Sequence, residues 1–266
     1  MCGFVHRGNA VQHKDGAFAE YIVAKRNIQI RIPDNLSFQE ATTLGVGIST
    51  VGQGLYQSLK LVLPSEPIKE PEPSLIYGGS TATDILVIQF AKLSGYTVLT
   101  TYSPYNFDLV KRLGADAVFD YKDPNSAAEI RKYTNNNLKL VFDTISLKAS
   151  SEYCEQAIST EGGDYGVFLF ISIEQKNVTT RYTLAYTIIG EEFSFGDTAF
   201  SARTEDKAFA EKFWAIAEKV LADGKVKVHQ PKVNPGSLQG VLDGLKLLKE
   251  DKVSGEKLVY NVAETP

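Results

Sequence analysis

The most constraining feature of the chain is a short apolar run that ends in two glycines and leads directly into an apolar-periodic helix. Residues 75–95 read Leu-Ile-Tyr-Gly-Gly-Ser-Thr-Ala-Thr-Asp-Ile-Leu-Val-Ile-Gln-Phe-Ala-Lys-Leu-Ser-Gly. This order predicts a strand, a tight turn and a helix N-terminus. Such a turn directs backbone N–H groups at an anion, and the helix dipole adds to the attraction. The segment therefore predicts a dinucleotide-binding domain.

The turn departs from the usual Gly-x-Gly-x-x-Gly fingerprint of such domains. Its glycines still let the backbone approach a pyrophosphate, and its hydroxyl groups can donate hydrogen bonds to one. The alternative is a strand–helix turn whose glycines serve packing alone. The candidate cofactor residues here are Gly78, Gly79, Ser80, Thr81, Ala82 and Thr83.

The end of the next expected strand bears on the choice of cofactor. It reads Thr-Tyr-Ser-Pro-Tyr-Asn over 101–106, and no carboxylate follows until Asp108. Folds that select NAD place an acidic side chain near this point to bind the ribose 2′-hydroxyl. Without that charge a 2′-phosphate is not repelled. Ser103 and Asn106 can donate to it, with Lys111 or Arg112 nearby, so the sequence favours NADPH. The alternative is that Ser103 only begins a turn and Asn106 only caps a helix.

From residue 74 to about 190, strand-like and helix-like segments alternate. Such alternation is typical of a parallel sheet with right-handed helical crossovers, covered on both faces. The fold class is therefore predicted to be α/β, with a Rossmann-type doubly wound parallel sheet. Strands are expected at 74–78, 96–101, 116–120, 139–143 and 165–171, and helices at 83–94, 106–113, 125–134 and 148–159.

The flanking segments carry weaker patterns. Short strands are expected at 3–5 and within 18–32, and Ser37 has the pattern of a helix cap. A glycine-rich helix is expected to run as far as Tyr56. The clearest amphipathic helices are expected over 204–222 and 237–249, and a strand over 258–262 closes the chain.

Composition narrows the classes of function. The chain has 266 residues, 43% of them hydrophobic and 23% charged, which is typical of a globular protein with a sizeable core. A net charge of −4 does not favour nucleic acid or an anionic membrane as a partner, and no apolar run is long enough to span a bilayer. Two cysteines fit a reducing, cytoplasmic setting, and the three histidines are not clustered with other metal ligands. We expect no bound metal.

Several segments resemble the medium-chain dehydrogenase/reductase superfamily. Within it they resemble a zinc-free fungal branch that includes the trans-acting enoyl reductases of polyketide synthesis and their toxin-cluster relatives. The resemblance covers essentially the whole chain, and Ser103–Asp108 and Phe119–Tyr121 are its most specific matches. The other matching segments are 16–21, 41–44, 77–83, 113–116 and 253–260.

The resemblance implies two domains, a GroES-like β-barrel domain that holds substrate and a Rossmann domain that holds NADPH. We expect residues 1–42 to be a remnant of the barrel domain, 43–200 to bind NADPH and 201–266 to return to the barrel domain. Members of the family are usually longer. The resemblance therefore also implies that the first barrel strands are missing, which would leave strand edges unpaired.

The same resemblance assigns roles to residues outside the glycine turn. It implies that Tyr121 contacts the adenosine 2′-phosphate together with Ser103, and that the segment from Leu169 to Ser172 meets the nicotinamide. It also implies that Gly47 and Thr50 line the cleft near the transferred hydride. For each of these side chains, ordinary packing is the alternative.

Asp84 departs from the family, which mostly has Gly or Ala at that position. A carboxylate in the first helical turn favours the helix dipole. Beside a pyrophosphate it would repel the ligand, whereas on the solvent flank the repulsion would be small. The sequence leaves these two placements open.

The expected reaction is the NADPH-dependent reduction of a carbon–carbon double bond conjugated to a carbonyl, with hydride going to the β-carbon. Thr50 and Tyr56 are the candidates for a proton donor. A quinone reductase, an alcohol dehydrogenase-like reductase and a non-catalytic nucleotide-binding protein remain as alternatives. The resemblance implies a small enoyl or enone substrate, and it includes both enzymes that work with a polyketide synthase partner and enzymes that stand alone.

Overall fold

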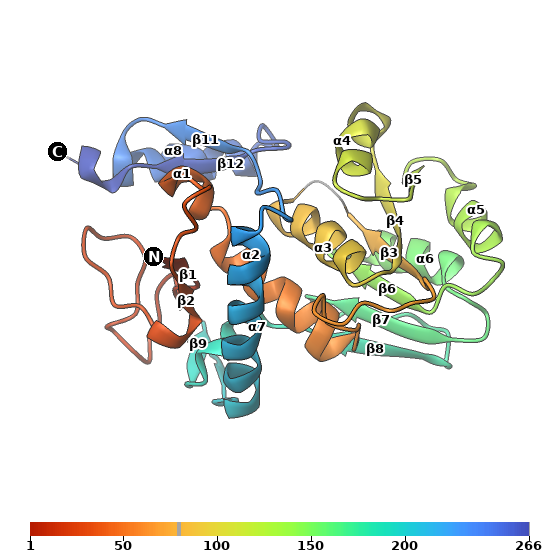
Figure 1. The fold of residues 1–266 in the computed structure, drawn as a ribbon. Coiled ribbons are helices and arrows are strands. Elements are labelled where there is room, and N and C mark those ends of the chain that lie inside the picture. Colours follow the sequence, from red (N-terminus) through yellow and green to blue (C-terminus); the bar gives the residue numbers. More distant parts are fainter. Residues whose placement is uncertain (79–80, 266) are drawn as a thin grey trace. The chain divides into compact units, whose positions relative to one another are not determined.

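The computed structural model describes residues 1–78 and 81–265 (Figure 1). The chain forms two compact units, one built from Met1–Ser49 with Ala185–Pro266 and the other from Thr50–Leu184. The sequence assigned 43–200 to cofactor binding, and the unit that holds the large sheet is shorter than that range. The assignment of a function to each unit stays a prediction.

The unit Thr50–Leu184 contains a six-stranded sheet in the order β5-β4-β3-β6-β7-β8, and every neighbouring pair is parallel. β4 and β5 follow on one side of β3, and β6, β7 and β8 follow on the other side. This strand order is typical of a doubly wound fold. This confirms the predicted α/β fold class. The strands are β3 (Pro73–Tyr77), β4 (Thr97–Tyr102), β5 (Ala117–Asp120), β6 (Leu140–Asp143), β7 (Gly163–Val167) and β8 (Val178–Tyr182).

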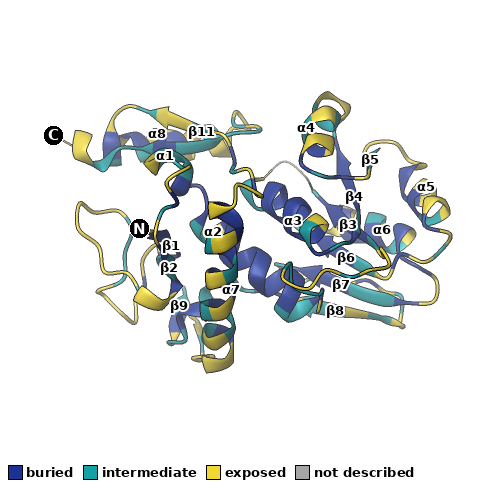
Figure 2. Ribbon diagram, in the orientation of Figure 1, coloured by how far each residue is buried: buried dark blue, intermediate teal, exposed yellow. Residues whose placement is uncertain are grey.

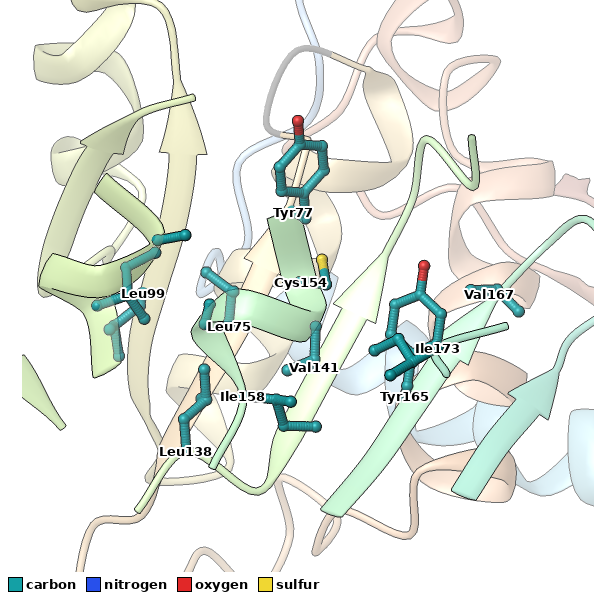
Figure 3. Close-up of a cluster of buried hydrophobic side chains, with 13 residues drawn as sticks. Leu75, Tyr77, Leu99, Leu138, Val141, Cys154, Ile158, Tyr165, Val167 and Ile173 are labelled. Atoms are coloured by element: carbon teal, nitrogen blue, oxygen red, sulfur yellow. The ribbon is translucent and has the colours of Figure 1, made fainter. Parts of the chain in front are cut away.

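Helices cover both faces of this sheet, as expected for strands with apolar side chains on either side. On one face α5 and α6 pack over a buried cluster that includes Leu75, Val141 and Tyr165 (Figure 3). Figure 2 shows that β3, β4 and most of α3 are buried, whereas α4 carries exposed residues. The helices are α3 (Ala82–Leu93), α4 (Phe107–Arg112), α5 (Ser126–Tyr133) and α6 (Lys148–Ala157), and a 3-10 turn at Pro104–Asn106 precedes α4.

The glycine-rich helix changes its winding along its length. It is an α-helix over Gly45–Val51 (α2) and a π-helix over Gly52–Ser58. A Cβ atom at Gly54 would lie 2.3 Å from Cζ of Phe142 in β6, so only glycine lets the π-helix pack this closely on the sheet. Long π-helices are rare, and the sequence predicted an ordinary helix here.

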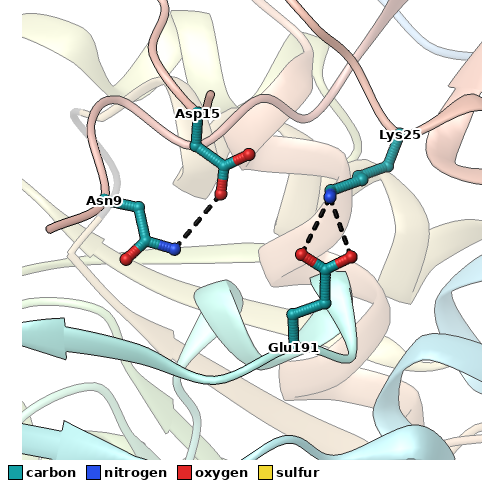
Figure 4. Close-up of polar contacts among 4 residues, drawn as sticks. All are labelled: Asn9, Asp15, Lys25 and Glu191. Atoms are coloured by element: carbon teal, nitrogen blue, oxygen red, sulfur yellow. Dashed lines mark hydrogen bonds and ion pairs between the residues drawn. The ribbon is translucent and has the colours of Figure 1, made fainter. Parts of the chain in front are cut away.

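Among its described residues the other unit contains three two-stranded sheets. β1 (Cys2–Gly3) pairs with β2 (Gln29–Ile30), β9 (Phe193–Phe195) pairs with β10 (Thr198–Phe200), and β11 (Pro231–Asn234) runs parallel to β12 (Lys257–Tyr260). Two polar contacts restrain the long N-terminal loop of this unit (Figure 4). Asn9 donates to Asp15 at 3.2 Å, and Lys25 pairs with Glu191 at 2.8 Å.

The helices of this unit follow the sequence pattern closely. α7 (Thr204–Ala222) and α8 (Ser237–Lys249) have the predicted bounds, and Ser37 caps α1 (Phe38–Ala41) through a capping box with Glu40. Short 3-10 turns lie at Arg26–Ile28, Ala185–Ile189 and Val262–Glu264. No helix in the described part of the chain combines the length and the apolar character needed to cross a membrane.

The strand prediction was wrong at 18–23. This segment runs through bends and irregular chain, and it leaves Phe18 and Tyr21 61% and 86% exposed. Its alternating pattern is that of a strand, but in the described chain no strand pairs with it. A strand needs a hydrogen-bonded neighbour, and the pattern alone does not supply one.

Candidate functional site

The candidate site is the edge of the large sheet at which its parallel strands end. Tyr77 is paired with Asp143, Asp143 with Val167, and Tyr102 with Asp120, so the carboxyl ends of five strands lie side by side. β3 and β6 are neighbours, but the chain builds outwards from them in opposite directions. In open α/β sheets ligands bind outside the carboxyl ends of the strands at such a switch point.

Gly78 follows β3 at this switch point and has a conformation that only glycine adopts readily. Its φ is +126°, and a Cβ atom there would lie 2.2 Å from Oγ1 of Thr144. Thr144 is held in place because both its backbone N–H and its hydroxyl donate to the carbonyl of Tyr77, at 3.0 and 2.8 Å. The backbone N–H of Gly78 donates to the Thr101 hydroxyl at 3.1 Å, and Thr144 fills the space that a Cβ would take. Packing therefore requires glycine here, and the same residue lies where a ligand would approach the backbone. Gly79 and Ser80 lie outside the described residues.

The N-terminus of α3 is closed by a capping box. The backbone N–H of Thr81 donates to Oδ2 of Asp84 at 2.8 Å, and the backbone N–H of Asp84 donates to the Thr81 hydroxyl at 3.3 Å. Thr81 is exposed, and Ala82 and Thr83 are half-buried in the first turn. The side chains of this turn are thus partly accessible, as the prediction for a phosphate-binding turn requires.

The structure rules out one of the two placements that the sequence left open for Asp84. It is fully buried, so it does not lie on the solvent flank, and its carboxylate is used within the turn itself. Burial raises the pKa of its carboxyl group, and nearby Asp143 raises the pKa further, while hydrogen bonds with Thr144 and Thr81 oppose the rise. The carboxylate is therefore part of the structure of the turn.

A second group of residues lies at the ends of β4 and β5. Because Tyr102 is paired with Asp120, Ser103 and Tyr121 each follow directly at the same edge. Ser103 and Asn106 are half-buried, and Tyr121 is 43% exposed. Asn106 lies at the N-cap of α4, but its side chain makes no capping hydrogen bond. These side chains are thus available to a ligand at the point where the sequence placed a 2′-phosphate.

The expectation that Lys111 or Arg112 lies near this point stays a prediction. Both residues belong to the last turn of α4. The helix begins at the carboxyl edge after β4 and leads the chain back to the start of β5, so its last turn lies towards the opposite edge of the sheet.

Of the remaining predicted cofactor residues, Leu169 and Ser172 follow β7 at the same edge. Both are exposed, Leu169 by 54%. Gly47 and Thr50 both lie in α2 and are buried. Contact of any of these four residues with a nicotinamide stays a prediction.

Tyr56 was predicted as a candidate proton donor, and the structure corrects this. Its side chain is buried, and its hydroxyl lies 3.0 Å from the carbonyl of Phe90, to which it donates, and 2.9 Å from Oγ of Ser94. Burial raises its pKa above the usual value for tyrosine. These contacts fix the π-helix against α3 and its C-terminal turn, so we assign Tyr56 to the core.

Sequence reasoning missed Asp143 and Thr144, which organise the end of β6. The Asp143 carboxylate accepts hydrogen bonds from the hydroxyls of Ser150 and Tyr165, both at 2.6 Å, and from the backbone N–H groups of Ile145 and Ser146. A signal was present in the sequence, because an Asp-Thr pair ends the strand expected at 139–143 and must therefore lie at the same edge as Gly78.

The described residues fit a dinucleotide at this edge. Besides the position of Gly78 at the switch point, the hydroxyl of Tyr102 is buried at the end of β4 and meets no hydrogen-bond partner within 1–78 and 81–265. Burial, with a smaller effect from Asp84, raises the pKa of Tyr102 to about 12, so the hydroxyl keeps its proton. A buried donor of this kind suits an acceptor on a ligand.

The described residues do not fit a zinc ion. No three histidine, cysteine, aspartate or glutamate side chains of the described chain come together in a group that could hold a metal. Both cysteines are buried, and burial raises the pKa of Cys154, which keeps its thiol protonated.

Comparison with known proteins gives three results. Residues 85–206 match the family model described as zinc-binding dehydrogenase. The chain is 60% identical over 200 residues to the trans-enoyl reductase TOXD of Cochliobolus carbonum, which covers 75% of this chain and 67% of that protein. It is 44% identical over 278 residues to the trans-enoyl reductase resD of Aspergillus sclerotiorum, which covers 98% of this chain and 78% of that protein.

Among solved structures, the CurK enoyl reductase is similar in fold. Its TM-score is 0.68 at 17% sequence identity, with 90% of this chain and 67% of that chain covered. At this identity the likeness establishes the fold only. The sequence identity to TOXD and resD over most of the chain establishes more: the protein belongs to the trans-enoyl reductases, a branch of the medium-chain dehydrogenase/reductase superfamily.

Proposed function

We propose that this protein is an NADPH-dependent oxidoreductase that reduces a carbon–carbon double bond conjugated to a carbonyl, without zinc. Membership of the superfamily implies a nicotinamide cofactor. The observation that carries the proposal is the position of Gly78, with its φ of +126°, at the switch point of the sheet and directly before the N-terminus of α3. We also propose that the unit Thr50–Leu184 is the cofactor-binding part.

The preference for NADPH is supported by the side chains at the ends of β4 and β5. Ser103 follows β4 where NAD-selective folds carry an acidic residue, and it can donate to a 2′-phosphate. Tyr121 is exposed beside it and can do the same. Gly78 and the first turn of α3, from Thr81 to Thr83, would hold the diphosphate, and Leu169 and Ser172 would lie towards the nicotinamide.

When bound, the reduced nicotinamide supplies the hydride for the β-carbon of the substrate. The residues of this chain have to hold the substrate carbonyl, exclude water and stabilise negative charge on the carbonyl oxygen as it forms. Tyr56 cannot serve as the donor to that oxygen without leaving the core. Thr50 is the remaining candidate of the two, and no further residue is assigned.

The substrate is proposed to be a small enoyl or enone compound. The support is the identity to TOXD and resD, both of which are named trans-enoyl reductases. We further propose a polyketide synthase as the partner that presents the substrate, because the sequence resembles the branch in which such partners occur. A cytoplasmic location is proposed on the same basis.

The test is to follow NADPH oxidation by absorbance with a panel of acceptors. We expect turnover with an α,β-unsaturated thioester, such as crotonyl-pantetheine, and much slower turnover with a quinone or a saturated aldehyde. A preference for the quinone or the aldehyde would contradict the proposed substrate class. Saturable NADPH binding without turnover on any acceptor would identify a nucleotide-binding protein instead of an enzyme.

A further inference from the structure

A lysine that the sequence analysis did not single out lies at the end of β5. Lys122 is exposed, and its ammonium lies 5.7 Å from the ring centroid of Tyr121, within the range of a cation–π contact. Since Tyr121 follows β5 at the carboxyl edge, the contact places a positive charge at that edge. Lys111 and Arg112 belong to the last turn of α4, further along the chain from that edge than Ser103.

The backbone that carries Lys122 is fixed. The N–H of Asp123 donates to the carbonyl of Asp120 at 3.1 Å, which closes a turn with Tyr121 and Lys122 in its two central positions. The N–H of Lys122 donates to Oδ1 of Asp120 at 3.0 Å. The two side chains therefore leave the same tight turn next to each other, and the turn is anchored to the last residue of β5.

The charges around Lys122 leave its ammonium available. Within the described chain Lys122 is in no ion pair. Each neighbouring carboxylate accepts a backbone N–H through Oδ1, Asp120 from Lys122 and Asp123 from Asn125 at 2.9 Å, and neither pairs with the ammonium. An exposed ammonium without an acidic partner can pair with an incoming anion.

We propose that Lys122 is a specificity-determining residue, which together with Tyr121 and Ser103 recognises the 2′-phosphate of the adenosine half of NADPH. The inference rests on the proposed function and adds the residue that supplies the positive charge. Two hydroxyl donors supply hydrogen bonds but no positive charge. The ammonium adds the attraction between opposite charges, which a 2′-phosphate offers and a ribose 2′-hydroxyl does not.

The test uses two nucleotides that differ only in the group recognised, adenosine 2′,5′-bisphosphate and adenosine 5′-monophosphate, with dissociation constants measured by calorimetry. Lys122→Gln removes the charge, and Lys122→Arg keeps it. Lys132→Gln is the matched control, because Lys132 is an exposed lysine in the last turn of α5, which leads to the opposite edge of the sheet.

We expect Lys122→Gln to bind the bisphosphate about tenfold more weakly than wild type, as the loss of one charge-assisted contact implies, and to bind the monophosphate almost unchanged. Lys122→Arg should restore most of the affinity, and Lys132→Gln should have no effect. The wild-type preference for the bisphosphate should also fall with added salt, because salt screens an exposed charge.

Two results would overturn the inference. They differ in whether they also contradict the proposed function. If wild-type protein prefers the bisphosphate and Lys122→Gln keeps that preference, the role of Lys122 is wrong while the proposed function stands. If wild-type protein binds neither nucleotide, the proposed cofactor site is wrong and this assignment falls with it.

Discussion

Asp84 and Thr81 are joined by two hydrogen bonds at the N-terminus of α3. Oδ2 of Asp84 accepts from the Thr81 N–H at 2.8 Å, and the Asp84 N–H donates to the Thr81 hydroxyl at 3.3 Å. An ionisable group is thus built into the turn that we propose binds the cofactor diphosphate. Burial raises the pKa of Asp84, so the folded state takes up its proton more readily than the unfolded state.

This gives a prediction about pH. A carboxyl group whose folded pKa is raised destabilises the fold increasingly as the pH rises above its unfolded value of about 3.9. Asp84→Asn keeps an acceptor for the Thr81 N–H but cannot ionise. We therefore expect the urea midpoint of Asp84→Asn to rise relative to that of wild type as the pH increases from 4 to 8. Curves that stay parallel over this range would show that Asp84 does not titrate as the structure indicates.

Gly78 provides a prediction about backbone strain. Gly78→Ala places a methyl group 2.2 Å from Oγ1 of Thr144 at a φ of +126°, and it should destabilise the fold by at least about 1–2 kcal/mol. Adding Thr144→Ala removes the clash but not the strained φ, so stability should return only in part. Gly8→Ala is the control, because a Cβ there meets nothing within 4 Å. Equal urea midpoints for Gly78→Ala and Gly8→Ala would rule out the described backbone.

The correction at Tyr56 can be tested by separating stability from catalysis. Tyr56→Phe removes the hydroxyl that contacts Phe90 and Ser94, so we expect a loss of about 1–2 kcal/mol in the free energy of unfolding. Because that hydroxyl is used in the core, the kcat of the folded variant should equal that of wild type. A large fall in kcat with unchanged stability would instead mean that Tyr56 acts on the substrate.

His6 leads to a prediction for the other unit. Its ring is buried against that of Tyr186, with centroids 4.6 Å apart; Nδ1 accepts the Gly8 N–H, and Nε2 has no hydrogen-bond partner within the described chain. Burial is the largest effect on the pKa of His6 and lowers it, and nearby Asp15 opposes this. The unfolded state therefore binds the proton more readily, and the stability that His6 contributes is lost as the pH falls below about 6.5.

We expect His6→Phe, which keeps an aromatic ring in this cluster, to lose less stability than wild type between pH 7 and pH 5. His13→Gln serves as the control, because it replaces an exposed histidine in the same unit. Thermal midpoints across this range give the comparison. Identical slopes for all three proteins would mean that His6 is not the group that titrates.

The parts of the fold that the sequence predicted are those with strong local patterns. α7 and α8 have a clear apolar stripe, and the strands from β3 to β6 are apolar runs bounded by turns, so their positions follow from periodicity alone. The parallel order followed from the alternation of strands and helices. Gly78 was found because few other residue types suit a turn of that shape.

The parts that were missed depend on contacts distant in sequence. β8 is a half-exposed edge strand with the sequence Val-Thr-Thr-Arg-Tyr, and its pairing with β7 decides that it is a strand. The sequence could not tell that Asp84 faces the interior, because a first-turn residue can face either way. In the same way, a tyrosine expected near a cleft can point its hydroxyl into the core, as Tyr56 does.

The central claim is that the carboxyl edge of the sheet, at Gly78 and the N-terminus of α3, holds NADPH. Titration of the purified protein with NADPH and with NADH, followed by the change in nucleotide fluorescence, tests it most directly. The account predicts saturable binding of both, with NADPH bound at least about tenfold more tightly because of the charge-assisted contacts at its 2′-phosphate. Folded protein that shows no saturable signal with either nucleotide would contradict the account.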